Sequence, residues 1–105
     1  MLGLNKRAKV QQIDGDTLNE FMKDKTVRRQ YIDVRTPQEF KSGKVKGFKN
    51  IPVQDLKQRI KELKEDEPVV LICATGSRSF FAGRVLAKAG FTSIYNVQRG
   101  LAAVK

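Results

Sequence analysis

Apolar and polar positions alternate along this chain in a pattern that predicts strands followed by helices. The longest apolar run is Val69–Ile72, which follows Pro68 and leads directly to Cys73. A run of this length suits a strand buried on both faces of a parallel sheet. Shorter runs predict four more strands, at Val10–Ile13, Arg29–Val34, Gly47–Ile51 and Ser93–Val97.

Helical spacing of apolar residues separates these runs. It predicts helices that begin near Asp14, at Thr36, at Asp55 (to Lys64) and at Phe80 (to Ala89). Thr36 as N-cap, Pro37 in the first position and Glu39 in a capping box define the second start. Gly43 ends that helix and Gly90 ends the last one. The alternation predicts an α/β fold: an open, mostly parallel sheet of about five strands with helices on both faces.

The length of 105 residues fits one domain with a single core. We expect this domain over residues 10–105 and a basic N-terminal tail over residues 1–9. The start lacks the apolar core of a secretory signal, and no apolar run approaches the roughly 20 residues that span a bilayer. The single cysteine fits a reducing compartment, so we expect a cytoplasmic location.

Charge narrows the function classes. The chain has 21 Lys and Arg against 11 Asp and Glu, a net charge of +10, and no histidine. A basic surface attracts anionic small molecules or an acidic protein partner. Nucleic acid is disfavoured, because no reading motif and no aromatic–basic interleaving occur. One cysteine without histidine excludes a zinc site and a Cys–His protease pair, and we expect no metal and no cofactor.

Cys73 is the candidate reactive residue. A lone cysteine is often an inert core residue, but Cys73 leaves its strand for a loop that precedes a helix. Loop amides and the positive helix end would converge there. Gly76 and Ser77 are small enough for the backbone to curve around the sulfur, and the charge of Arg78 would lower the thiol pKa. We therefore expect an ionised thiol held by main-chain amides in an open cup.

Three blocks of sequence resemble single-domain rhodaneses. Cys73–Ser79 resembles their C-x-x-G-x-R-S loop, Tyr31–Phe40 their D-V-R-x-x-x-E-[FY] segment, and Gly43–Pro52 their G-H-I-x-G-A-x-N-I-P segment. The resemblance covers roughly residues 10–101. It departs from the family at Lys44, where His is usual, and at Arg99, where Gly is usual. The resemblance implies a rhodanese-like fold and sulfurtransferase activity.

The resemblance also implies roles for individual residues. Cys73 would be the catalytic nucleophile. Asp33 and Arg35 would support the loop, and we predict that Asp33 pairs with Arg78. The substrate-binding residues would be those that follow the cysteine: Ala74, Thr75, Gly76, Ser77, Arg78 and Ser79. The implied reaction moves a sulfane sulfur from thiosulfate or a persulfide donor, through a Cys73 persulfide, to a thiol or cyanide.

Other functions remain as alternatives. A cysteine phosphatase is disfavoured, because its loop places five residues between Cys and Arg whereas four separate Cys73 from Arg78. A non-catalytic rhodanese-like module that docks an acidic partner is a second reading. A carrier that passes sulfur from protein to protein is a third. The expected partners are accordingly a small anionic sulfur donor, a persulfide-carrying protein or an acidic protein.

Overall fold

The computed structural model describes residues 8–104, and residues 1–7 of the predicted tail lie outside the described residues. The strands are β1 (Val10–Ile13), β2 (Gln30–Asp33), β3 (Lys49–Asn50), β4 (Val69–Ile72) and β5 (Ile94–Val97). They form one five-stranded sheet in the order β1-β5-β4-β2-β3, and every pairing is parallel. The predicted α/β fold is therefore confirmed, with the strand before Cys73 at the centre of the sheet.

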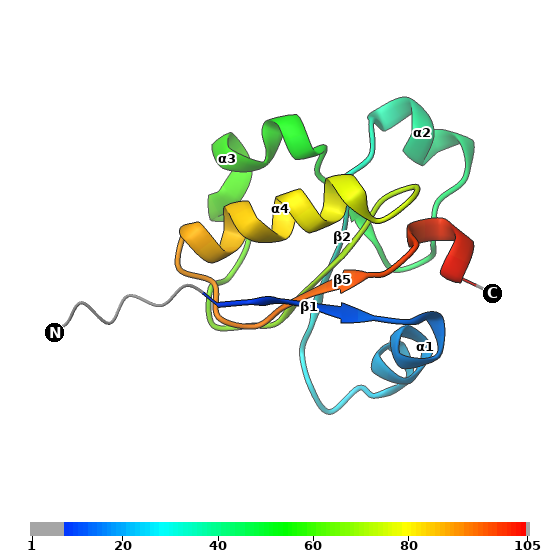
Figure 1. Ribbon diagram of the computed structural model, residues 1–105, viewed down its shortest axis with the longest axis horizontal. Helices are drawn as coiled ribbons and strands as arrows, with labels where there is room; N and C mark the ends of the chain where they lie inside the picture. Colours follow the sequence, from blue (N-terminus) through cyan, green and yellow to red (C-terminus); the bar gives the residue numbers. More distant parts are fainter. Residues whose placement is uncertain (1–7, 105) are drawn as a thin grey trace, which may run out of the picture.

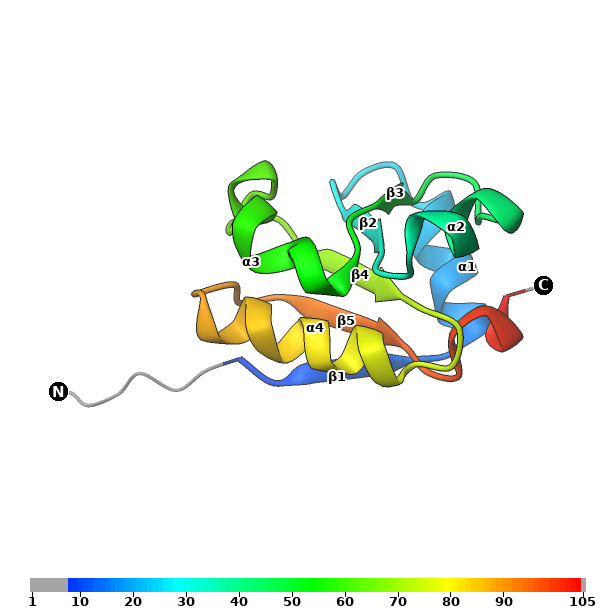
Figure 2. The same cartoon turned by 90° about the horizontal axis from the view of Figure 1, so that it is seen from above.

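Helices cover both faces of this sheet. They are α1 (Gly15–Lys23), α2 (Pro37–Ser42), α3 (Leu56–Arg59) and α4 (Ser77–Lys88), with 3₁₀ segments η1 (Val53–Asp55), η2 (Ile60–Glu62) and η3 (Gly100–Ala103). Figures 1 and 2 show α3 and α4 on one face and α1 on the other. In Figure 1 the arrowheads of β1 and β5 point to the side of the molecule on which α1, α2 and η3 (red) lie. In the described part of the chain, no helix is long and apolar enough to cross a membrane.

The core lies in two layers separated by the sheet. Val69 and Leu71 of β4 pack in the layer under α3 and α4, whereas Val70 and Ile72 pack in the layer with α1. All four are 0% exposed. Successive strand residues point to opposite faces, so the next residue, Cys73, belongs to the layer under α4.

The helix predicted over Asp55–Lys64 is instead divided into η1, α3 and η2. Its apolar positions still face inward, because Leu56 and Leu63 are buried. Arg59 and Glu62 form an ion pair of 2.8 Å with i,i+3 spacing. Residues with this spacing eclipse one another in a 3₁₀ helix. The ion pair is compatible with this tighter last turn.

Helix α4 begins at Ser77, three residues before the predicted start at Phe80. Gly76 precedes it with φ 99°, a left-handed conformation that glycine adopts at no steric cost. A Cβ atom on Gly76 would also lie 3.1 Å from the backbone nitrogen of Arg99. Half of the predicted substrate-binding loop is therefore the first turn of α4.

Candidate active site

Three hydrogen-bond donors converge on the sulfur of Cys73. The amide of Gly76 lies 3.1 Å from Sγ, the amide of Ser79 3.4 Å and the hydroxyl of Ser79 3.3 Å. Gly76 and Ser79 belong to the start of α4, where amides have no partner within the helix. The amides turn towards the sulfur, as the sequence predicts.

The predicted open cup is wrong, because the Cys73 side chain is 0% exposed. The alternation along β4 places this residue on the same face as Leu71, in the apolar layer under α4. The thiol is therefore closed off from solvent in this structure. Of that loop, Thr75 and Ser77 are exposed and Ala74 is half-buried.

The pKa of the Cys73 thiol lies below its ordinary value. Burial acts to raise this pKa, but the Ser79 hydroxyl and the amides of Ser79, Gly76 and Thr75 lower it, and the net direction is downward. Hydrogen bonds to the charged form stabilise a thiolate in this way. The donors, and not the predicted charge of Arg78, are the principal cause.

The Ser79 hydroxyl has more acceptors than protons. Its oxygen faces Cys73 Sγ at 3.3 Å, the Gly76 carbonyl oxygen at 3.2 Å and, closely, Oδ1 of Asn96. Asn96 lies on β5, is 2% exposed, and donates to Gln12 Oε1 at 2.8 Å and to the Gly76 oxygen at 3.2 Å. Asn96 was not among the site residues predicted from the sequence, although a polar residue within an apolar strand was a signal.

The predicted pair of Asp33 with Arg78 is wrong. The Asp33 carboxylate is fully buried and binds Arg35, with Nη2 at 2.8 Å from Oδ2 and Nε at 3.0 Å from Oδ1. Arg35 lies two residues further along the chain, so it reaches Asp33 locally. Arg35 also donates to the carbonyl oxygens of Glu39 at 3.1 Å and Gly43 at 2.7 Å. This buried pair therefore holds α2 against the end of β2.

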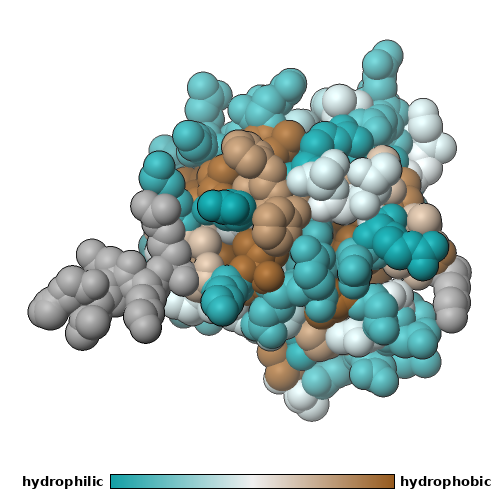
Figure 3. Space-filling view, viewed as in Figure 1, coloured by the Kyte–Doolittle hydropathy of each residue, from teal (hydrophilic) through white to brown (hydrophobic). Residues whose placement is uncertain are grey.

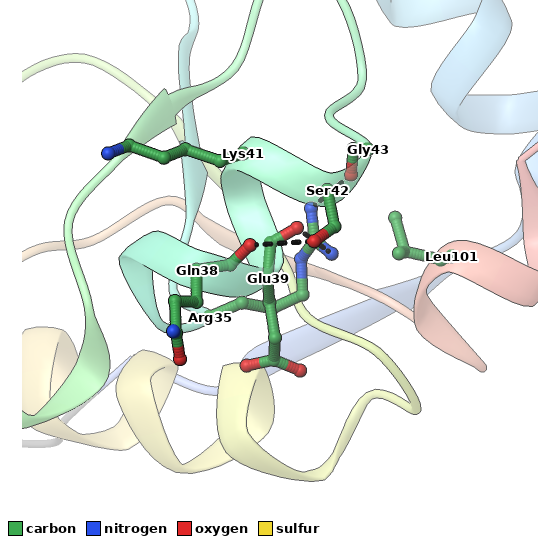
Figure 4. Close-up of a pocket in the computed structure, with 7 residues that line it drawn as sticks. All are labelled: Arg35, Gln38, Glu39, Lys41, Ser42, Gly43 and Leu101. Atoms are coloured by element: carbon green, nitrogen blue, oxygen red, sulfur yellow. Dashed lines mark hydrogen bonds between the residues drawn. The ribbon is translucent and has the colours of Figure 1, made fainter.

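Arg78 pairs with Glu39 instead. Its Nη1 lies 2.7 Å from Oε1 and its Nη2 3.0 Å from Oε2, and both side chains are about one-third exposed. Figure 4 shows the Glu39 side chain extending from α2 towards α4. The hydrogen bonds from Arg78 and from the Thr36 amide lower the pKa of Glu39 to about 2. Glu39 also completes the capping box that the sequence predicts; its role towards Arg78 was missed.

Segment η3 supports the loop from behind. The Leu101 amide donates to the carbonyl oxygens of Cys73 at 3.0 Å and of Ala74 at 3.2 Å. A Cβ atom on Gly100 would collide with the Cys73 oxygen, so only glycine permits this approach. Arg99 has φ 70°, an unusual value for a residue with a side chain.

A shallow hollow of about 670 Å³ lies beside the loop, between α2 and Leu101 (Figure 4). Arg35, Glu39 and Lys41 contribute its charges. It borders the site because Glu39 binds Arg78 and Leu101 binds Cys73. The thiol itself does not line it. Within residues 8–104, no group of three Asp, Glu, His or Cys side chains could hold a metal ion.

Known proteins are similar to this chain in sequence. The model of the Rhodanese-like domain family matches residues 14–105. A protein named Sulfurtransferase from Allochromatium vinosum is 30% identical over 94 residues, which cover 90% of this chain and 87% of that protein. YqhL of Bacillus subtilis is 47% identical over 73 residues, but the match spans only 70% of this chain and 58% of YqhL.

A solved structure agrees with the sequence relatives. The crystal structure of a rhodanese-like domain protein from Staphylococcus aureus superposes with a TM-score of 0.79 at 29% identity, and the match covers 90% of both chains. The chain therefore belongs to the rhodanese-like domain family, which includes proteins named as sulfurtransferases.

Proposed function

We propose that this protein is a sulfurtransferase in which Cys73 carries the transferred sulfur as a persulfide. The observation that supports this most strongly is the convergence of three donors on one sulfur, which lowers its pKa. A thiolate, and not a thiol, is the nucleophile in sulfur chemistry. An inert core cysteine would not require two amides and a hydroxyl around it.

The reaction needs only the thiolate and these donors. With thiosulfate, the Cys73 thiolate attacks the outer sulfur, a new S–S bond forms, the S–S bond of thiosulfate breaks, and sulfite leaves with the electron pair. An acceptor thiolate then attacks the outer sulfur of the Cys73 persulfide and regenerates the Cys73 thiolate. The amides at the start of α4 stabilise negative charge in both steps.

Burial of Cys73 sets a condition on this reaction. Because the side chain is 0% exposed, Ala74–Ser77 must move outward before a donor reaches the sulfur. The basic chain attracts anionic donors such as thiosulfate. A cytoplasmic setting, which the lone cysteine favours, supplies low-molecular-weight thiols as acceptors.

Intact mass spectrometry tests the proposal. The protein is mixed with thiosulfate or glutathione persulfide, and we expect a mass gain of one sulfur atom that a reducing agent reverses. Cys73→Ser removes the gain, and circular dichroism checks that this variant is folded. If neither donor loads the wild-type protein, the proposal fails and a non-catalytic binding module is left.

A second measurement separates an enzyme from a protein-to-protein carrier. Both would be loaded at Cys73, but an enzyme turns over many times with a small acceptor. We expect continuous formation of thiocyanate from thiosulfate and cyanide. Loading without such turnover would assign the carrier role instead.

A further inference from the structure

The outer side of α4 has an apolar surface that the proposed chemistry does not use. Phe81 is 60% exposed, and half-buried Ile60 and Val85 lie beside it. These three side chains line a hollow of about 500 Å³ between η2 and α4. Figure 3 shows apolar surface over this face of the molecule, bordered by hydrophilic side chains. Burial of an exposed aromatic ring by a binding partner removes a large apolar area from water and so favours binding.

Positive charge surrounds this apolar surface. Lys57, Arg84 and Lys88 line the same hollow and are exposed. Among the described residues, none of the three forms an ion pair, and no carboxylate lines the hollow. Arg59 and Arg78, by contrast, both bind glutamates. These three cations are therefore available to carboxylates of another molecule.

One end of this surface, at Phe81, lies near the loop that follows Cys73. Phe81 follows Ser77 by one helical turn, roughly 6 Å along the axis at 1.5 Å per residue. Ser77 and Thr75 belong to the exposed part of the loop over Cys73. A protein that covers Phe81 therefore also reaches the loop that must move to uncover the sulfur.

We propose that Phe81, Ile60, Val85, Lys57, Arg84 and Lys88 form a docking surface for an acidic protein that exchanges sulfur with Cys73. The docking segment of this partner has carboxylates on both sides of an apolar side chain, which match the cations around Phe81. This inference rests on the proposed function. A second copy of this chain fits poorly, because two molecules with a charge of +10 repel each other.

Peptide binding tests the surface without relying on sulfur chemistry. The probe is a fluorescent peptide with one Leu between pairs of Glu and a terminal Cys, blocked for this measurement. We expect saturable binding by fluorescence anisotropy, about tenfold weaker for Phe81→Ser and for the double variant Arg84→Glu/Lys88→Glu. The matched control is Lys25→Glu/Arg28→Glu, which has the same net charge but lies in the exposed segment between α1 and β2.

Sulfur transfer tests the link to Cys73. The same peptide, converted to a persulfide at its Cys, donates its outer sulfur to the Cys73 thiolate; one S–S bond breaks, another forms, and the peptide thiolate leaves. We expect Arg84→Glu/Lys88→Glu to slow this transfer about tenfold relative to Lys25→Glu/Arg28→Glu. Transfer from glutathione persulfide should change by less than about twofold in both variants.

The outcomes separate the docking proposal from the proposed function. The docking surface is overturned if the peptide does not bind, or if both double variants lose peptide affinity and transfer rate equally. Either result leaves loading of Cys73 by small donors unaffected. Peptide binding at the surface without any loading of Cys73 overturns sulfur transfer. Binding to phosphatidylserine vesicles with the same dependence on Phe81, together with no peptide binding, assigns the surface to a membrane and contradicts the proposal.

Discussion

Arg78 and Ser79 are neighbours in α4, yet they belong to two different kinds of site. Ser79 is 0% exposed and its hydroxyl faces a buried sulfur and the buried Oδ1 of Asn96, whereas Arg78 forms an ion pair with Glu39 in which both side chains are about one-third exposed. Hydrogen bonds in a low-dielectric interior act more strongly than ion pairs screened by water. The buried side therefore tunes the thiol, and the exposed side anchors α4 to α2.

We expect the largest effect on the reactivity of the Cys73 thiol when its buried donor Ser79 is replaced. Ser79→Ala removes one donor from the Cys73 thiolate, so the pKa of Cys73 rises towards its ordinary value. At pH 7 a smaller thiolate fraction should slow alkylation by iodoacetamide about tenfold. The pH at which half of the thiol ionises, followed by thiolate absorbance, separates this effect from access.

Ser77→Ala is the matched control, because its hydroxyl is exposed and faces Thr75 at 3.3 Å instead of the sulfur. We expect little change in this variant. Equal pKa values for Cys73 in wild type and Ser79→Ala would contradict the role given to the buried donor.

We expect a smaller effect, on the free energy of unfolding, when Arg99 is replaced. Arg99 has a left-handed backbone, which costs a residue with a Cβ atom about 1 kcal/mol. Arg99→Gly should therefore raise the free energy of unfolding by about 1 kcal/mol in urea titrations. Gln98→Gly, at a position without positive φ, should lower it. A loss of stability in Arg99→Gly would show that the arginine side chain matters more than backbone strain.

The smallest effect is expected on the exposed side. Glu39→Gln keeps a side chain that can complete the capping box but removes the charge that faces Arg78, so we expect a loss of about 0.5 kcal/mol at pH 7. The pKa of Glu39 is lowered from 4.5 to about 2, so the pair stabilises the fold above pH 4.5 and loses its effect as the pH falls towards about 2. Urea titrations across this range should show the two proteins converging.

Glu39→Gln also tests whether the exposed ion pair affects the reactivity of Cys73. Because Arg78 is not the main cause of the lowered pKa of Cys73, Glu39→Gln should change the alkylation rate by less than about twofold. A tenfold change would move the control of the thiol to the exposed side.

Local signals in the sequence were sufficient for much of the fold. The apolar run before Cys73 correctly predicted a parallel strand buried on both faces, because such burial requires a run of this kind. The Thr36 and Glu39 capping box formed as predicted, since its two hydrogen bonds join residues three positions apart. The left-handed Gly76 also fits the expected sharp turn of the chain.

Pairings between distant residues could not be obtained in this way. Asp33 had several arginines available, and spacing alone did not show that Arg35 reaches it locally while Arg78 turns to Glu39. The exposure of Cys73 depended on which face of β4 the residue takes and on what covers that face. Asn96 and Ser79 meet only because β5 lies beside β4.

Cys73 carries the single thiol of this chain, and this has a consequence for the order of events in the proposed reaction. Proteins with a second, resolving thiol can discharge a persulfide internally by closing a disulfide, but this chain has a single cysteine. If Cys73 carries sulfur as proposed, this sulfur can pass only to a different molecule. The lifetime of the persulfide would then depend on the concentration of the sulfur acceptor.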